Sequence, residues 1–229
     1  MVDYARRLIH VPILHSPADM GSMAEGLAAA MIDRLGRRHW DEYLALLDDF
    51  WQRVRTGLQR LGLDYMTVDL YQDGLPVCGK ELELVQKAAS AGSENHQLLL
   101  DLVAKGASLM GTEDPRLLLD EYREVKAALE VRAPSVEENR PEDGPAHVRS
   151  EPNLIHQMTA DEAGHTSMRR QTLRRRDAYI GQRINQTLGA GRTGILFIGM
   201  LHDVEAHLPA DIVLTRLVST GGARKDKGR

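Results

Sequence analysis

The sequence is poor in cysteine and in long apolar runs. Its single cysteine, Cys78, excludes an intrachain disulfide and a cysteine-based zinc finger, which fits a reducing compartment. No run of about 18 apolar residues is present to cross a bilayer, and the amino terminus lacks the apolar core and cleavage site of a signal peptide. We therefore expect a soluble, cytoplasmic protein with no membrane partner.

The sequence also lacks an excess of positive charge and several well-known catalytic motifs. The net charge is -4, and the one basic cluster, at residues 169–176, is better explained by a helix face or an anion contact than by a polynucleotide groove. No phosphate-binding glycine loop follows the first predicted strand, and no serine-nucleophile elbow or His-Glu-x-x-His pair is present. Nucleic acid is therefore not an expected partner, and nucleotide binding has no support.

A length of 229 residues fits one large domain, which we predict at residues 1–220. Residues 133–165 differ from the rest, because four prolines and many acidic residues leave little apolar surface to bury. This composition predicts a long loop, which is either a lid over a crevice or a plain surface insertion. Residues 221–229 form a polar, basic tail with no predicted role in folding.

The clearest element is the stretch Thr193–His202. Its apolar core, Ile195–Ile198, is bounded by glycines, a pattern typical of a buried central strand in a parallel sheet. Ligand crevices in such sheets lie just beyond the carboxyl ends of the strands. We therefore predict that His202 lies at a functional crevice, the alternative being that it merely caps the strand.

The other elements predict an α/β fold with a mainly parallel sheet flanked by helices. Strands are expected at 6–14, 66–71, 107–110 and 211–218, and helices at 23–35, 39–61, 80–91, 94–105, 116–131 and 167–188. Pro12 predicts that the first strand is interrupted there or lies at a sheet edge at that point. The apolar and aromatic stripe of residues 40–61 predicts either a core helix or the seam of a homo-oligomer.

Titratable side chains follow each of the first four predicted strands: His15 and Asp19, then Asp73, then Glu113 and Asp114, and finally His202. In a parallel sheet these ends converge. A divalent zinc, manganese or iron ion held by His15, Glu113 and His202 could activate water there. A histidine and a glutamate could equally act as base and acid without metal. Asp114 has a second interpretation as the cap of the next helix, which would leave Glu113 facing the crevice.

Two adjacent stretches resemble a known superfamily. The helix Arg176-Asp-Ala-Tyr-Ile-Gly-Gln-Arg-Ile-Asn185, followed by Gly194-Ile-Leu-Phe-Ile-Gly-Met-Leu-His202, is similar to the group of erythromycin esterases, TraB-type proteins and haem-binding ChaN-like proteins. The match covers residues 174–205. The first motif of the group is Gly-Glu-x-His or Gly-Thr-x-His, whereas Val-Pro-Ile-Leu-His15 stands here, so His10 and His15 remain alternatives and the strand-end position favours His15. The resemblance implies His15, Glu113, Arg176 or Arg183, and His202 as site residues.

Three functions are expected from these observations. The first is a hydrolase of an ester, amide or related bond in a small molecule, with the histidines as bases or metal ligands, the carboxylates as acids or bases, and Arg176 or Arg183 binding an anion. Its substrate-binding residues would be Asp19, Asp73, Asp114 and Asn185. The second is a carrier of haem or another small ligand, and the third is a non-catalytic protein that assembles through the helix at residues 40–61.

Overall fold

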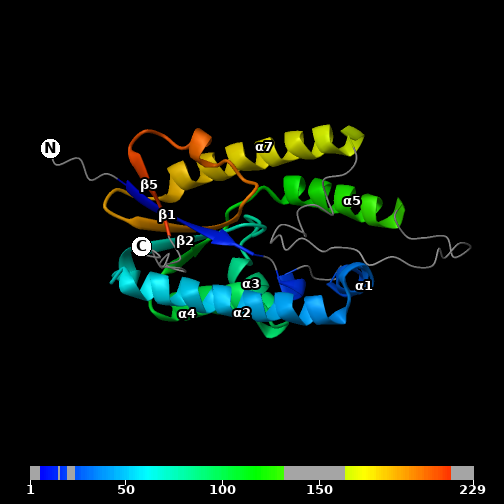
Figure 1. Ribbon diagram of the computed structural model, residues 1–229. Coiled ribbons are helices and arrows are strands. Elements are labelled where there is room, and N and C mark those ends of the chain that lie inside the picture. The colour runs from blue at the N-terminus through cyan, green and yellow to red at the C-terminus, as the bar shows by residue number, and fades with distance from the viewer. Residues whose placement is uncertain (1–5, 15, 20–23, 132–162, 218–229) are drawn as a thin grey trace, which may run out of the picture.

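A five-stranded, all-parallel sheet forms the centre of the molecule. The computed structural model describes residues 6–14, 16–19, 24–131 and 163–217. The strands are β1 (Arg6–Ile13), β2 (Val68–Gln72), β3 (Ser108–Met110), β4 (Thr193–Gly199) and β5 (Ile212–Arg216), in the spatial order β3-β2-β4-β1-β5 (Figure 1). The predicted α/β fold with a parallel sheet is confirmed, and the apolar stretch at 195–198 lies in its central strand, β4.

Helices cover both faces of the sheet. They are α1 (Ala24–Leu35), α2 (Arg37–Arg60), α3 (Glu81–Ser90), α4 (Glu94–Ala104), α5 (Pro115–Val131) and α7 (Ala163–Thr187), with short 3₁₀ turns η2 (Tyr65–Thr67) and η3 (Glu205–His207). Helices α1 to α4 lie on one side of the sheet and α5 and α7 on the other (Figure 1). No helix in the described part of the chain is long and apolar enough to span a bilayer.

The face of the sheet toward α2, α3 and α4 carries the larger apolar core. Alternate residues of β1, including Ile9 and Val11, point into it because successive side chains of a strand face opposite sides. Trp51, Val54 and Leu58 of α2 fill the same core and are at most 2% exposed. Much of the apolar stripe of residues 40–61 is therefore buried within a single chain, and its use as an oligomer seam stays a prediction.

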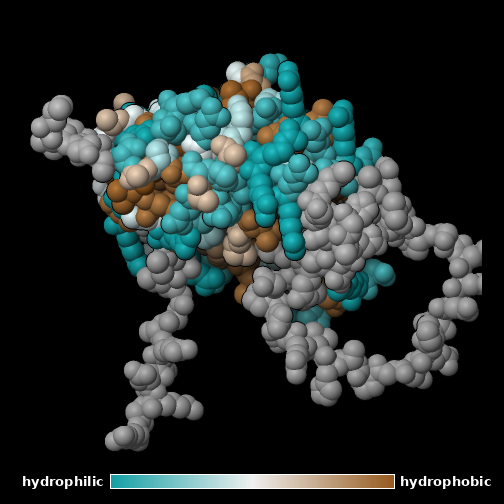
Figure 2. Space-filling view, turned by 90° about the horizontal axis from the view of Figure 1, so that it is seen from above, coloured by the Kyte–Doolittle hydropathy of each residue, from teal (hydrophilic) through white to brown (hydrophobic). Residues whose placement is uncertain are grey.

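The opposite face packs against α7. Leu8 of β1 and Leu196 of β4 meet Ile180 and Ile184 of α7 and Leu188 directly after it, which recur at intervals of four residues. The side chains of Ile180 and Ile184 are both fully buried. The face of the molecule seen from this side is largely hydrophilic (Figure 2).

At Pro12, strand β1 is paired with a described strand on one side only. Strand β1 pairs with β4 as far as Ile13, but its pairing with β5 ends at His10. Pro12 aligns with Ile198 of β4 and has no counterpart in β5. The edge interpretation of Pro12 is thus confirmed for the described residues, and the strand is not interrupted.

Three of the predicted features fall on residues outside the described ranges. These are His15, most of the predicted loop at 133–165 and the tail at 221–229. The loop prediction extended three residues too far, because α7 begins at Ala163.

Candidate functional site

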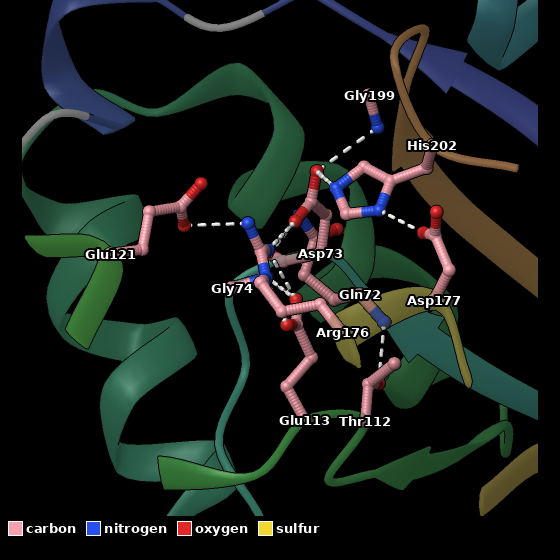
Figure 3. Close-up of polar contacts among 10 residues, drawn as sticks. All are labelled: Gln72, Asp73, Gly74, Thr112, Glu113, Glu121, Arg176, Asp177, Gly199 and His202. Atoms are coloured by element: carbon pink, nitrogen blue, oxygen red, sulfur yellow. Dashed lines mark hydrogen bonds and ion pairs between the residues drawn. The ribbon is translucent and has the colours of Figure 1, made fainter. Parts of the chain in front are cut away.

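Four segments meet at the carboxyl ends of β2, β3 and β4. Asp73 directly follows β2, Glu113 is the third residue after β3, and His202 is the third residue after β4. Arg176, from the middle of α7, reaches between them (Figure 3). All four side chains are at most 7% exposed, so the sheet and α7 together bury a group of charged residues.

The backbone after β2 and β3 holds the two carboxylates in place. Gly74 adopts a φ of +75°, which a side chain would disfavour, and its amide donates to Oε1 of Glu113 at 2.6 Å. The amide of Val77 donates to the carbonyl of Glu113 at 2.8 Å. The two loops are therefore tied together, and Glu113 has a fixed position below Asp73.

Arg176 is the central cation of the group. Its Nε and Nη2 donate to the two oxygens of Glu113 at 2.5 and 2.7 Å, Nη2 also donates to Asp73 at 2.6 Å, and Nη1 donates to Glu121 at 2.5 Å. Burial alone would lower the pKa of Arg176, but these carboxylates raise the pKa above its ordinary value. With four donor contacts made to carboxylates, Arg176 organises the acids, and its predicted binding of a substrate anion stays a prediction.

Glu113 is the most deeply buried of these four side chains. Its side chain is 1% exposed, and burial raises its pKa, as does the nearby charge of Asp73. The hydrogen bonds and the charge of Arg176 oppose that rise. Glu113 and Arg176 are therefore a mutually dependent buried pair.

His202 lies between two carboxylates. Its Nδ1 is 2.5 Å from Oδ1 of Asp177, and its Nε2 is 3.4 Å from Oδ2 of Asp73 (Figure 3). The amide of Gly199 donates to the same oxygen of Asp73 at 3.0 Å, and the amide of Asp203 donates to Asp177 at 3.1 Å. Both acids that face the imidazole are thus fixed by backbone donors.

The charge of His202 follows from these neighbours. Burial acts to lower its pKa, but the charge of Asp73 and the hydrogen bond with Asp177 outweigh burial and raise the pKa of His202 to about 10. The imidazole is therefore protonated at neutral pH. It is suited to donate a proton or to stabilise negative charge, and it is not suited to be a base.

The remaining predicted site residues make their contacts elsewhere. Asp114 accepts from the amide of Arg116 at 2.8 Å and so caps α5, as the second interpretation of this residue expected. Asp19 accepts from the amide of Ser16 at 2.6 Å and from the hydroxyl of Ser93.

Asn185 and Arg183 lie on α7 beyond the charged group. Asn185 accepts from Arg6 at 2.7 Å, at the start of β1 and hence at the opposite end of the sheet. Arg183 donates from Nε to the carbonyl of Gly111 at 3.0 Å, just after β3. Of the predicted residues, the structure brings together Asp73, Glu113, Arg176 and His202.

The predicted metal site at His15, Glu113 and His202 lies only partly within the described ranges and stays a prediction. In that part of the chain, no group of three or more His, Cys, Asp or Glu side chains is arranged to hold a metal ion. His15, the third predicted ligand, lies outside it. Since both ring nitrogens of His202 face carboxylates, its geometry favours proton transfer over metal ligation.

Two residues of the group were not predicted from the sequence, Asp177 and Glu121. Asp177 directly follows Arg176, and neighbouring helical residues point about 100° apart, so no helical pattern predicts that both side chains face the site. Arg176 and Asp177 are nevertheless both buried, Arg176 against Asp73 and Asp177 against His202 (Figure 3). Glu121 comes from α5, on the second turn of the helix, and carries no motif.

Comparison of the sequence with protein-family models gave no match, and comparisons with curated proteins and with solved structures gave none either.

Proposed function

We propose that this protein is a hydrolase of ester- or amide-type bonds in which His202 donates a proton to the leaving group. The observation that carries the proposal is the buried imidazole at the carboxyl end of β4 with a carboxylate at each ring nitrogen. A leaving alkoxide or amide needs a proton, and a positioned acid accelerates such steps by roughly 10²- to 10⁴-fold.

The two ring nitrogens of His202 have different roles in this proposal. The contact of Nδ1 with Asp177 is short, at 2.5 Å, so this contact sets the orientation of the ring. The contact of Nε2 with Asp73 is long, at 3.4 Å, so this N–H is the one that can turn to a substrate. Asp177 is thus the orienting acid, and Nε2 is the proton donor.

Arg176 supports the acid indirectly. By donating to Oδ1 of Asp73 at 2.6 Å it fixes the carboxylate whose other oxygen faces His202. Arg183 is only partly buried and donates its Nε to the carbonyl of Gly111, just after β3, so it is the better candidate to bind an anionic part of the substrate. In this proposal Arg176 is a positioning residue and Arg183 a substrate-binding one.

The leaving group provides a direct test. A p-nitrophenyl ester releases a stable phenolate that needs no proton, whereas an alkyl ester of the same acid releases an alkoxide that does. The purified protein and its His202→Gln variant would be assayed on matched pairs of such esters. We expect the variant to lose roughly 10²-fold or more of kcat on the alkyl ester and only a few-fold on the p-nitrophenyl ester.

A matched control is His39→Gln, because His39 is an exposed residue of α2 in the other helical layer. It should retain the activity of the wild type on both esters. Equal losses on both esters in His202→Gln would contradict the role of His202 as an acid. A wild-type protein that hydrolyses no ester in the series would overturn the proposed function.

A further inference from the structure

Two large apolar side chains are exposed directly beside the proposed proton donor. Met200 and Leu201 precede His202 in the chain, and they are 51% and 58% exposed. Single exposed apolar residues are common in soluble proteins and need no explanation, whereas contiguous ones mark binding surfaces. Among the large apolar residues that are exposed in the described ranges, these two alone are adjacent in sequence. The pair is therefore a candidate binding surface.

The two residues form the corner of a tight turn. The amide of His202 donates to the carbonyl of Gly199 at 3.2 Å, so Met200 and Leu201 are the central residues of a four-residue turn. Glycine, proline, asparagine, aspartate and serine dominate turns, because they supply the backbone angles or the local hydrogen bonds that a turn needs. Methionine and leucine supply neither. The turn itself thus gives no reason for apolar residues at its corner.

Both ends of this turn are fixed to carboxylates of the charged group. The amide of Gly199 donates to Oδ2 of Asp73 at 3.0 Å (Figure 3). The amide of Asp203, directly after the turn, donates to Asp177 at 3.1 Å. The same two carboxylates face the ring of His202. The apolar pair is therefore held in a fixed position relative to the proton donor, and such a preorganised surface loses little conformational entropy on binding.

The rest of the charged group offers no apolar surface. Arg176 is bound to Asp73 and Glu113, and the ring of His202 lies between carboxylates. Covering charged groups with apolar surface removes their water and is unfavourable. Among the described residues beside the proton donor, an apolar part of a substrate therefore finds its favourable contact on the exposed corner of the turn.

We propose that Met200 and Leu201 bind an apolar chain on the leaving side of the substrate, so that the preferred substrates are esters or amides of apolar alcohols or amines; this inference rests on the function proposed above. His202 gives its proton to the leaving atom, which places that atom against the imidazole. The carbon chain attached to the leaving atom then extends over the two residues that precede His202. Their contact removes apolar surface of both partners from water.

The size of the preference follows from the apolar contact. Full burial of a methylene group favours binding about fourfold, and an open surface that covers one side of the chain supplies about half of that free energy, which is about twofold per methylene. A butyl ester is longer than the methyl ester of the same acid by three methylene groups. The turn should therefore raise kcat/KM for the butyl ester about tenfold relative to the methyl ester.

The kinetic test measures the ratio of kcat/KM for the butyl and methyl esters of one acid. This ratio does not depend on the fraction of folded enzyme, and the intrinsic reactivity of the two esters cancels when proteins are compared. In the double variant Met200→Ser, Leu201→Ser the ratio should fall about tenfold. The matched control is Val213→Ser, because Val213 of β5 is also 51% exposed, and it should keep the wild-type ratio. An unchanged ratio in the double variant would overturn the inference.

Binding is tested without hydrolysis by 2-hexanone, an unreactive ketone that carries the same butyl chain. In protein labelled with ¹³C at the methionine methyl groups, the Met200 signal is identified by its absence in Met200→Leu. It should shift saturably with 2-hexanone and not with acetone, which lacks the chain. Met66 is the internal control, because it is 68% exposed and lies in η2, before β2 and hence at the other end of the sheet. Equal shifts at both methionines would show non-specific contact and overturn the inference.

The two proposals fail in different ways. An active wild type whose Met200 signal does not respond to 2-hexanone would overturn the apolar site while the hydrolase function stands. An inactive wild type whose signal responds would overturn the hydrolase function and support the binding of an apolar group at the turn. A smaller mass of the double variant in light scattering would show that the pair is a contact between copies of the chain, which would also overturn the inference.

Discussion

The charge of His202 makes the stability of the protein depend on pH in a defined direction. The pKa of His202 is raised from 6.5 to about 10 in the folded chain, so folding favours the protonated ring. This stabilisation is fully present below the pKa that His202 has in the unfolded chain, and it is lost as the pH rises through the pKa that His202 has in the folded chain. One pKa unit corresponds to about 1.4 kcal/mol, so the full effect is of the order of 5 kcal/mol.

The assay compares the wild type with His202→Gln by urea unfolding at about pH 6.5 and about pH 9.5. Other groups titrate in both proteins, so their contributions cancel in the difference between the two. The wild type should have the higher free energy of unfolding at pH 6.5, and its difference from the variant should decrease by about 3 to 4 kcal/mol on going to pH 9.5. If both proteins lose stability in parallel, the imidazole is not protonated in the folded state and the reasoning is refuted.

Two further predictions concern α7 and have matched controls. Arg176→Met leaves the buried carboxylates of Asp73 and Glu113 without their cation and should lower the free energy of unfolding by about 3 to 5 kcal/mol, whereas Arg38→Met removes an exposed ion pair of α2 and should cost under about 1 kcal/mol. Comparable losses in urea unfolding would contradict the central place of Arg176. Gly181→Ala would put a methyl group 2.7 Å from the Cβ of the facing η3 residue and should cost about 1 to 3 kcal/mol, whereas Gly26→Ala in α1 has nothing within 4 Å and should be neutral or stabilising. Thermal unfolding of the pair checks this, and an unaffected Gly181→Ala would show that α7 and η3 do not pack as closely as described.

The fold could be predicted from the sequence because its local signals agree with its packing. The unbroken apolar run in β4 indicated a strand covered on both faces, and it is the central strand. The predicted helices at 80–91 and 94–105 each end one residue beyond the observed helix, and Gly92 and Gly106, which follow them, adopt positive φ angles. Helix starts were harder to place, since α7 begins at Ala163 without an acidic first turn or an obvious boundary.

The site could be predicted only in part. Residues that directly follow strands, such as Asp73 and His202, converge because a parallel sheet brings those ends together. The partners supplied by helices could not be predicted, because which face of α7 or α5 meets the sheet end depends on tertiary packing. Asp177 was missed for this reason, although it sets the orientation of the His202 ring.

The most direct test of the account is the pH dependence of kcat on an alkyl ester, corrected for hydrolysis by hydroxide, for the wild type and for Asp177→Asn. The acid must be protonated, so the wild-type rate should fall as pH rises through the raised pKa of His202, which is about 10. Asp177→Asn removes the carboxylate at Nδ1, so the pKa of His202 should drop and the alkaline fall in rate should move to lower pH. An alkaline limb that is unchanged in Asp177→Asn would contradict the claim that His202 is the proton donor.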